Sequence, residues 1–183
     1  MVINSDSRSR EQERPRPNPY GGGPRPERVA SIRPGRKDDW PLFWRATMET
    51  VWRDIPAEEK EDLPWGAFER HFRERVTPVI EYEATELLVA EEEGRLEGYV
   101  LLGLIGSFYS PENLGFIYDI WVREESRGKG VGRELLEGAF RRARERGLWK
   151  VKLEVSARNA RARAIYAAAG FAEERLILGK TLP

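Results

Sequence analysis

A glycine-rich segment, SRGKGVGRELLEGAFRRA at residues 126–143, constrains the fold of this chain more than any other feature. The run FIYDIWV at 116–122 precedes it and is typical of a buried strand, because it is rich in β-branched and aromatic residues. After the glycines, apolar residues recur at three- and four-residue steps: Leu135, Leu136, Ala139, Phe140 and Ala143. This spacing predicts an amphipathic helix that ends near Gly147. The order is therefore strand, glycine-rich turn, helix.

Two familiar phosphate-binding motifs do not fit this turn. A dinucleotide fingerprint starting at Gly128 would need a glycine at position 133, where the chain has Arg133. A P-loop needs Ser or Thr after Gly-Lys, but Lys129 is followed by Gly130. What remains is an arginine at 127 followed by glycines at 130 and 132. Glycines at the start of a helix let an anion approach the backbone N–H groups, so we interpret the turn as an anion-binding site.

Composition bounds the class of protein. The chain has 183 residues, of which 40% are hydrophobic, and no run near 18 apolar residues, so we expect one soluble domain without a membrane span. The absence of cysteine excludes disulfides, a catalytic thiol and thiolate metal sites. With no secretory signal visible either, we expect a cytoplasmic protein that carries no metal. The lone histidine, His71, lies in a charged segment and is expected at the surface.

Residues 1–27 differ in composition from the remainder, residues 28–183. They are rich in proline, glycine and charge, which is typical of a flexible or arm-like tail. The tail contains arginines at 8, 10, 14, 16 and 25, but interspersed glutamates weaken a role in nucleic-acid binding. Val2, Ile3 and Tyr20 are the few apolar anchors with which a swapped arm could hold a homodimer together, and the sequence leaves this open.

The remaining pattern predicts a mixed α/β domain. We expect strands at 29–35, 116–122 and 148–156, a hairpin with strands on either side of Glu93 and Gly94, and a last strand from Phe171. Helices are expected at about 38–54, at 65–82 with a break near Pro78, from the glycine-rich turn to 146, and at 159–169. Between residues 57 and 93 the net charge is −8, whereas between 123 and 146 it is +3. One part of the chain would suit a cation and the other an anion.

The two stretches YDIWVREESRGKGVGRELLEGAFRRARERG and LEVSARNARARAIYAAAGF together resemble the acyl-CoA-binding core of the GNAT superfamily of N-acetyltransferases. The resemblance covers about 150 residues. It implies a mixed, mostly antiparallel sheet with central parallel strands, flanked by helices. Within the superfamily, the second stretch is most similar to the ribosomal-protein N-terminal acetyltransferase branch.

The resemblance implies that acetyl-CoA is a co-substrate. The strand would offer backbone groups to the pantetheine arm, and the turn would hold the pyrophosphate. The residues so implicated are Ile120, Trp121, Val122, Arg127, Gly128, Lys129, Gly130, Val131, Gly132, Arg133, Asn159 and Tyr166. Asn159 and Tyr166 are two helical turns apart and share a face, although Asn159 is equally suited to cap the helix.

The resemblance also implies catalytic roles. Tyr166 would donate to the departing thiolate, because a phenol of pKa about 10 keeps its proton at neutral pH. Glu154 matches the position of a proposed general base, although its strand face also carries Lys150 and Lys152 and could simply face solvent. Asp119 is a further candidate base, as are Glu81 and Glu83, either directly or through water.

We therefore expect an enzyme that transfers acetyl from acetyl-CoA to a primary amine by direct attack in a ternary complex. A cysteinyl acyl-enzyme is excluded, because the chain has no cysteine. The resemblance places acceptor contacts in the first two helices and the hairpin loops, which include the acidic segment, so a cationic small amine or peptide amine fits best. The alternative is a non-catalytic acyl-CoA sensor that keeps the anion site but does no chemistry.

Overall fold

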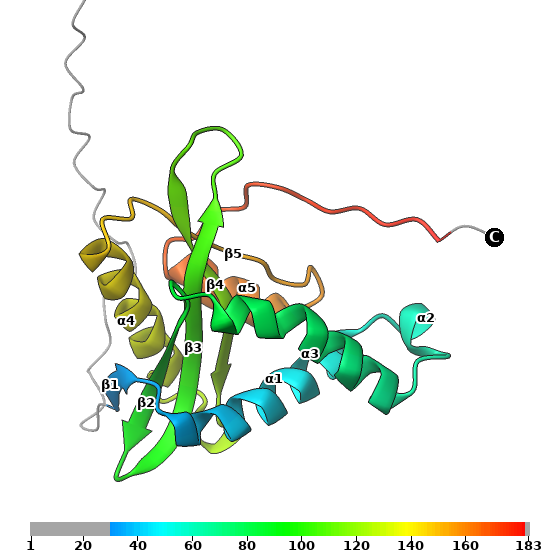
Figure 1. Ribbon diagram of the computed structural model, residues 1–183, viewed down its shortest axis with the longest axis horizontal. Helices are drawn as coiled ribbons and strands as arrows, with labels where there is room; N and C mark the ends of the chain where they lie inside the picture. Colours follow the sequence, from blue (N-terminus) through cyan, green and yellow to red (C-terminus); the bar gives the residue numbers. More distant parts are fainter. Residues whose placement is uncertain (1–29, 182–183) are drawn as a thin grey trace, which may run out of the picture.

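The computed structural model describes residues 30–181, which form a mixed α/β fold around one five-stranded sheet (Figure 1). The strands, in their order across the sheet, are β1 (Ser31–Pro34), β2 (Glu86–Glu92), β3 (Arg95–Gly106), β4 (Asn113–Val122) and β5 (Val151–Leu153). The helices are α1 (Trp40–Asp54), α2 (Ala57–Lys60), α3 (Trp65–Glu81), α4 (Val131–Glu145) and α5 (Ala160–Ala168), with short 3-10 turns η1 (Lys37–Asp39) and η2 (Glu124–Ser126). The first four strands pair antiparallel, and β5 pairs parallel to β4. The expected fold class is confirmed, whereas the tail predicted for residues 1–27 lies outside the described residues.

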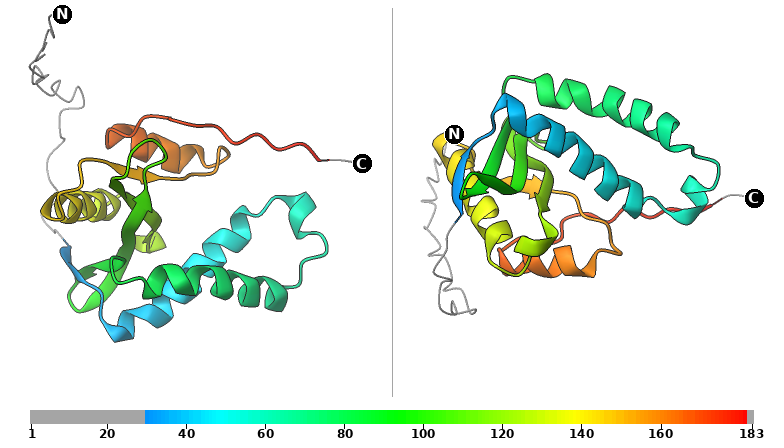
Figure 2. Two further views of the ribbon diagram at one scale, coloured as in Figure 1. Left: turned by 45° about the horizontal axis from the view of Figure 1, so that its top comes forward. Right: turned by 90° about the horizontal axis from the view of Figure 1, so that it is seen from below.

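Helices cover both faces of the sheet (Figure 2). The helices α1 and α3 lie on one face, and α4 and α5 lie on the other. Strand β3 is buried on both sides: Tyr99 and Leu101 pack toward α1, whereas Val100 and Leu102 pack toward α4. This explains why β3 reads as a continuous apolar run rather than an alternating one.

The hairpin between β2 and β3 forms where the sequence predicts it. Glu93 and Gly94 have φ angles of 50° and 77°, the left-handed conformations that a tight two-residue hairpin requires. The predicted amphipathic helix also forms as α4, and Gly147 follows it with φ 71°. Its apolar stripe is buried, with Leu135 and Ala139 fully so.

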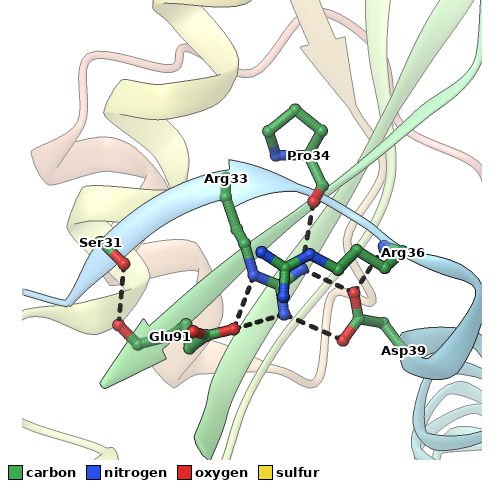
Figure 3. Close-up of polar contacts among 6 residues, drawn as sticks. All are labelled: Ser31, Arg33, Pro34, Arg36, Asp39 and Glu91. Atoms are coloured by element: carbon green, nitrogen blue, oxygen red, sulfur yellow. Dashed lines mark hydrogen bonds and ion pairs between the residues drawn. The ribbon is translucent and has the colours of Figure 1, made fainter. Parts of the chain in front are cut away.

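An ion cluster joins β1, β2 and the start of α1 (Figure 3). The Nε of Arg33 donates to Glu91 at 2.6 Å, and its Nη1 donates to Asp39 at 2.8 Å. The backbone N–H of Arg36 donates to the same carboxylate at 2.6 Å. Burial opposes ionisation of Asp39, but these donors overcome it and lower the pKa of the carboxyl. The cluster thus fixes the entry into α1, the helix that forms one wall of the site described below.

The structure corrects three sequence predictions. No strand forms from Phe171, and the backbone of this segment joins no ladder. Its side chains form ion pairs instead: Glu173 with Arg163 of α5, and Glu174 with Lys150 and Lys152 at the start of β5. As a result, the parallel pair β4–β5 lies at the edge of the sheet rather than at its centre. Strand β5 is three residues long, not nine. Finally, α3 continues through Pro78 without a break.

Two absences concern the described helices and side chains. Within residues 30–181, none has the length and apolar character that crossing a bilayer requires. The same part of the chain holds no cluster of three or more His, Asp or Glu side chains suited to a metal ion.

Candidate active site

Strands β4 and β5 diverge, and a groove opens between them. Their parallel pairing ends at Ile117 and Leu153, so residues 119–122 of β4 pair only with β3. Beyond that point the chain of β5 turns into α5, which leaves a cavity of about 550 Å³. Its wall is formed by the end of α1, the end of β4, the glycine-rich turn and the start of α5; among its residues are Arg53, Ile120, Trp121, Val122, Ser126, Arg127, Gly128, Gly132, Arg158, Asn159, Arg161 and Tyr166.

A β-bulge lies at the point where the strands diverge. In the pairing of β3 with β4, Leu102 is opposite Ile117 and Leu101 is opposite Asp119, so Tyr118 is an extra residue. The bulge reverses the alternation of side chains: Ile117 and Ile120 both pack on the α4 side. Asp119 consequently faces the α1 side, where it meets Tyr99. Simple alternation would have placed Asp119 on the same face as Ile117.

The glycine-rich turn has the backbone conformation that its sequence suggests. Gly128 and Gly130 have φ angles of 80° and 90°, and a Cβ on either would meet no atom within 4 Å. Gly130 is the N-cap of α4, whose first N–H groups therefore face open space. Three guanidinium groups besides that of Arg127 line the same cavity, from Arg53, Arg158 and Arg161. The site can therefore attract an anion through helix, backbone and side chains together.

A buried carboxylate holds this turn in place. Glu97 of β3 is 5% exposed and accepts a short hydrogen bond from the Ser126 hydroxyl. Its other oxygen lies 3.0 Å from the Nε of Arg95. The backbone N–H of Arg123 donates to the Glu97 carbonyl at 2.8 Å, and its guanidinium donates to Leu96. The loop that leads into the anion site is thus tied to the centre of the sheet.

Helix α5 brings two predicted residues to the groove. Asn159 caps the helix, accepting from the Ala162 N–H at 3.0 Å, and its side chain also lines the cavity. Asn159 can therefore both cap the helix and contact a ligand in the cavity, because the cap uses only the oxygen of its side-chain amide. Tyr166 lies on the same side and contacts Phe171 ring to ring. Burial, reinforced by the nearby Asp119 charge, raises the pKa of Tyr166 to about 12, so its hydroxyl keeps its proton at neutral pH.

A second cavity, of about 320 Å³, adjoins the first and shares Ile120, Asn159 and Tyr166 with it. Its wall carries three carboxyl groups, from Asp54, Asp119 and Glu154. Burial raises the pKa of Asp119, although hydrogen bonds from Thr47, Tyr99 and the Ile120 N–H act in the opposite direction. Glu154 is exposed, whereas the adjacent Lys150 and Lys152 are paired with Glu174.

Most of the predicted site residues meet in these two cavities. The exceptions are Lys129, Gly130, Val131 and Arg133, which are not part of either wall; Val131 instead packs in the core at 6% exposure. The acidic segment at 57–93 and the exposed His71 also contribute nothing to the walls. The acidic character of the second cavity comes instead from α1, β4 and the residue that follows β5.

The sequence reasoning missed Thr47, Tyr99 and Glu97. Each is a polar side chain at a position that the hydrophobic pattern assigns to the core, and each is less than 6% exposed. That conflict between a polar group and a buried position is the signal that could have identified them.

Comparison with known proteins identifies the family of this chain. The model of the acetyltransferase (GNAT) family matches residues 39–171. An uncharacterized N-acetyltransferase of Archaeoglobus fulgidus is 30% identical over 139 residues, which cover 74% of this chain and 88% of that protein. Alignments with two further relatives, an N-acetyltransferase of Bacillus subtilis and a mycothiol acetyltransferase of Acidothermus cellulolyticus, span 46% and 44% of those proteins.

Solved structures share the fold. A protein from Pyrococcus furiosus described as an acetyl transferase superposes with a TM-score of 0.73 at 24% identity, covering 83% of this chain and 99% of that one. An aminoglycoside N-acetyltransferase in complex with CoA superposes with a TM-score of 0.60 at 15% identity, covering 84% and 100%. The relatives named here do not indicate the ribosomal-protein branch. The chain belongs to the GNAT family and is an acetyltransferase.

Proposed function

We propose that this acetyltransferase transfers the acetyl group of acetyl-CoA to a primary amine of a small molecule, peptide or protein, by direct attack in a ternary complex. The observation that carries the proposal is the meeting of two cavities of opposite character at Tyr166. The larger is lined by the glycine-rich turn and by Arg53, Arg127, Arg158 and Arg161 together with Asp54, whereas the smaller is lined by Asp54, Asp119 and Glu154 and by no arginine or lysine. A polyanionic donor and a cationic acceptor would thus approach the same hydroxyl from two sides.

The larger cavity fits acetyl-CoA, which supplies the acetyl group as an activated thioester. Arg127 and the N–H groups at the start of α4 would hold the pyrophosphate. The edge of β4 at Ile120, Trp121 and Val122 pairs with no strand on the β5 side, so it would accept the pantetheine amides there once the Val122 carbonyl releases the Nε of Arg127, which donates to it at 3.2 Å. A solved fold relative with CoA bound is consistent with this assignment.

Tyr166 is suited to protonate the leaving sulfur. As the amine nitrogen bonds to the acetyl carbon, the carbon–sulfur bond breaks and negative charge develops on sulfur. The buried Tyr166 hydroxyl, which keeps its proton at neutral pH, can donate that proton to the thiolate. The phenolate so formed is reprotonated, directly or through solvent, by the second proton that the attacking nitrogen loses as the amide forms. The chain holds no cysteine, so the acetyl group passes to the amine without a cysteinyl intermediate.

The smaller cavity is suited to the acceptor. An amine is an ammonium ion at neutral pH and must lose a proton before its lone pair can attack. Asp119 and Glu154 are carboxyl groups in the wall that can accept this proton. Asp54 at the end of α1 adds negative charge to the same cavity, which favours a cationic amine over an acidic one.

The test is a screen of acetyl-CoA consumption against amino acids, polyamines, aminoglycosides and short peptides, together with calorimetric titration of acetyl-CoA. We expect acetyl-CoA to bind and at least one cationic amine to be acetylated, with the product identified by its mass increase. The peptides also test the ribosomal-protein branch. Tight acetyl-CoA binding with no turnover of any acceptor would favour a sensor, and absence of binding would overturn the proposal.

A further inference from the structure

A buried tyrosine hydroxyl meets the carboxyl group of Asp119 beneath the smaller cavity. The Tyr99 side chain is 0% exposed, and its Oη donates to Oδ2 of Asp119 at 2.8 Å. The side chain of Thr47, which is 4% exposed, lies within hydrogen-bonding reach of both groups, and its hydroxyl can donate to either one. Hydroxyls buried among apolar residues need such partners, because an unsatisfied one destabilises the fold.

The ring of Tyr99 is held from two sides. It packs edge-on against Phe43 of α1, with 5.2 Å between ring centroids. On the neighbouring strand it stacks on Trp121, with centroids 5.7 Å apart and planes 20° from parallel. With the ring fixed by the core, the direction of the hydroxyl is fixed as well, and it points at the carboxyl that the bulge in β4 has turned toward α1.

Asp119 connects this buried pair to the cavity. It lines the wall together with Glu154 and Tyr166, whereas Tyr99 and Thr47 contribute to neither cavity wall. Tyr99 can therefore influence a bound acceptor only through Asp119. Tyr99 would thus position the Asp119 carboxyl without touching the substrate itself.

We propose that Tyr99, assisted by Thr47, orients Asp119 and maintains it as the carboxylate that receives the proton of the acceptor amine. This inference rests on the proposed function. In the step concerned, a nitrogen–hydrogen bond of the ammonium breaks and its proton passes to a carboxylate oxygen of Asp119. The electron pair of that bond stays on nitrogen as the lone pair that attacks the acetyl carbon. Asp119 later returns the proton to solvent.

Opposing effects act on the charge of Asp119. Burial raises its pKa, and the donors Thr47, Tyr99 and the Ile120 N–H lower it. The other titratable groups that share its cavity are Asp54 from α1, Tyr118 from β4, Glu154 immediately after β5 and Tyr166 from α5. Removing the Tyr99 hydroxyl takes away one stabilising donor and leaves burial unchanged, so the carboxyl should lose its proton only at higher pH.

The experiment follows the Asp119 carboxyl and the catalysed rate separately. Infrared difference spectra recorded across a pH series report the protonated carboxyl stretch, which Asp119→Asn assigns by deleting it. The variants are Tyr99→Phe and Thr47→Val, each of which removes one hydroxyl and little volume. Tyr109→Phe is the matched control, because its hydroxyl bonds Arg175 outside both cavities. The pH profile of kcat/KM is measured with an amine identified in the acceptor screen.

In Tyr99→Phe we expect the infrared titration and the acidic limb of kcat/KM to move together by about 0.5–1 pH unit to higher pH. Thr47→Val should move both in the same direction, and Tyr109→Phe should move neither. An unmoved infrared titration in both Tyr99→Phe and Thr47→Val would overturn the inference. So would a moved titration with an unmoved kinetic limb, since Asp119 would then not be the proton acceptor. Failure of the proposed function would appear differently, as a wild-type protein that acetylates no amine.

Discussion

Gly130 and Gly147 stand at the two ends of α4 in matched environments. Their φ angles are 90° and 71°, and a Cβ on either would meet no atom within 4 Å. Valine should strain the backbone to a similar degree at both positions, whereas only position 130 adjoins the first N–H groups of α4, which the proposed function assigns to the pyrophosphate. We expect Gly130→Val to weaken acetyl-CoA binding at least tenfold and Gly147→Val to leave it unchanged, as measured by calorimetric titration. Equal affinity in the two folded variants would remove the pyrophosphate from this turn.

The Tyr166 hydroxyl can be removed without disturbing the packing of its ring against Phe171. We expect Tyr166→Phe to lower kcat about 10²-fold, the lower range for one positioned acid, while acetyl-CoA affinity stays nearly constant. Tyr109→Phe serves as the control for loss of a phenol elsewhere. An unchanged kcat in a reaction limited by chemistry would assign Tyr166 to packing alone.

At the level of elements, local patterns predicted α4, the hairpin and the capped start of α5, because each depends on residues close in the sequence. Asp119 shows the limit of such reasoning. The bulge at Tyr118 is defined by its pairing with β3, so no alternation within β4 could reveal which side Asp119 faces. The strand expected from Phe171 failed for a similar reason, since Lys150, Lys152 and Arg163 engage its glutamates from other elements.

The ion cluster at the start of α1 gives an element-level prediction. The folded-state pKa of Asp39 lies below the unfolded value of about 3.9. The carboxylate therefore stabilises the fold above that pH, and its contribution disappears as the pH falls through the folded-state pKa. Asp39→Asn should cost about 2 kcal/mol at pH 7 in urea unfolding, with the difference from wild type shrinking below about pH 4. The exposed neighbour Asp38 provides the control, and equal losses in Asp38→Asn would contradict a specific role for the cluster.

At the level of the whole molecule, the segment after α5 divides into a packed and an unpacked part. Phe171 is in contact with Phe140 and Tyr166, whereas Leu176, Ile177 and Leu178 are 76%, 90% and 91% exposed. Deleting residues 176–181 should change the free energy of unfolding by less than about 0.5 kcal/mol, because no buried contact is lost. Phe171→Ala should cost about 2–3 kcal/mol by leaving a cavity between α4 and α5. A large loss in the deletion variant would show that these apolar residues are covered in solution.

Glu97 has a consequence for the entropy of ligand binding. Because its buried carboxylate already holds Ser126, the loop before α4 is ordered when the protein folds and need not be ordered again when a ligand arrives. Immobilising a loop at the moment of binding consumes affinity that a preorganised loop retains. In the proposed function, the affinity for acetyl-CoA would therefore depend on Glu97, a residue of β3 that lines neither cavity. The loop that would bind the pyrophosphate becomes ordered when the sheet folds.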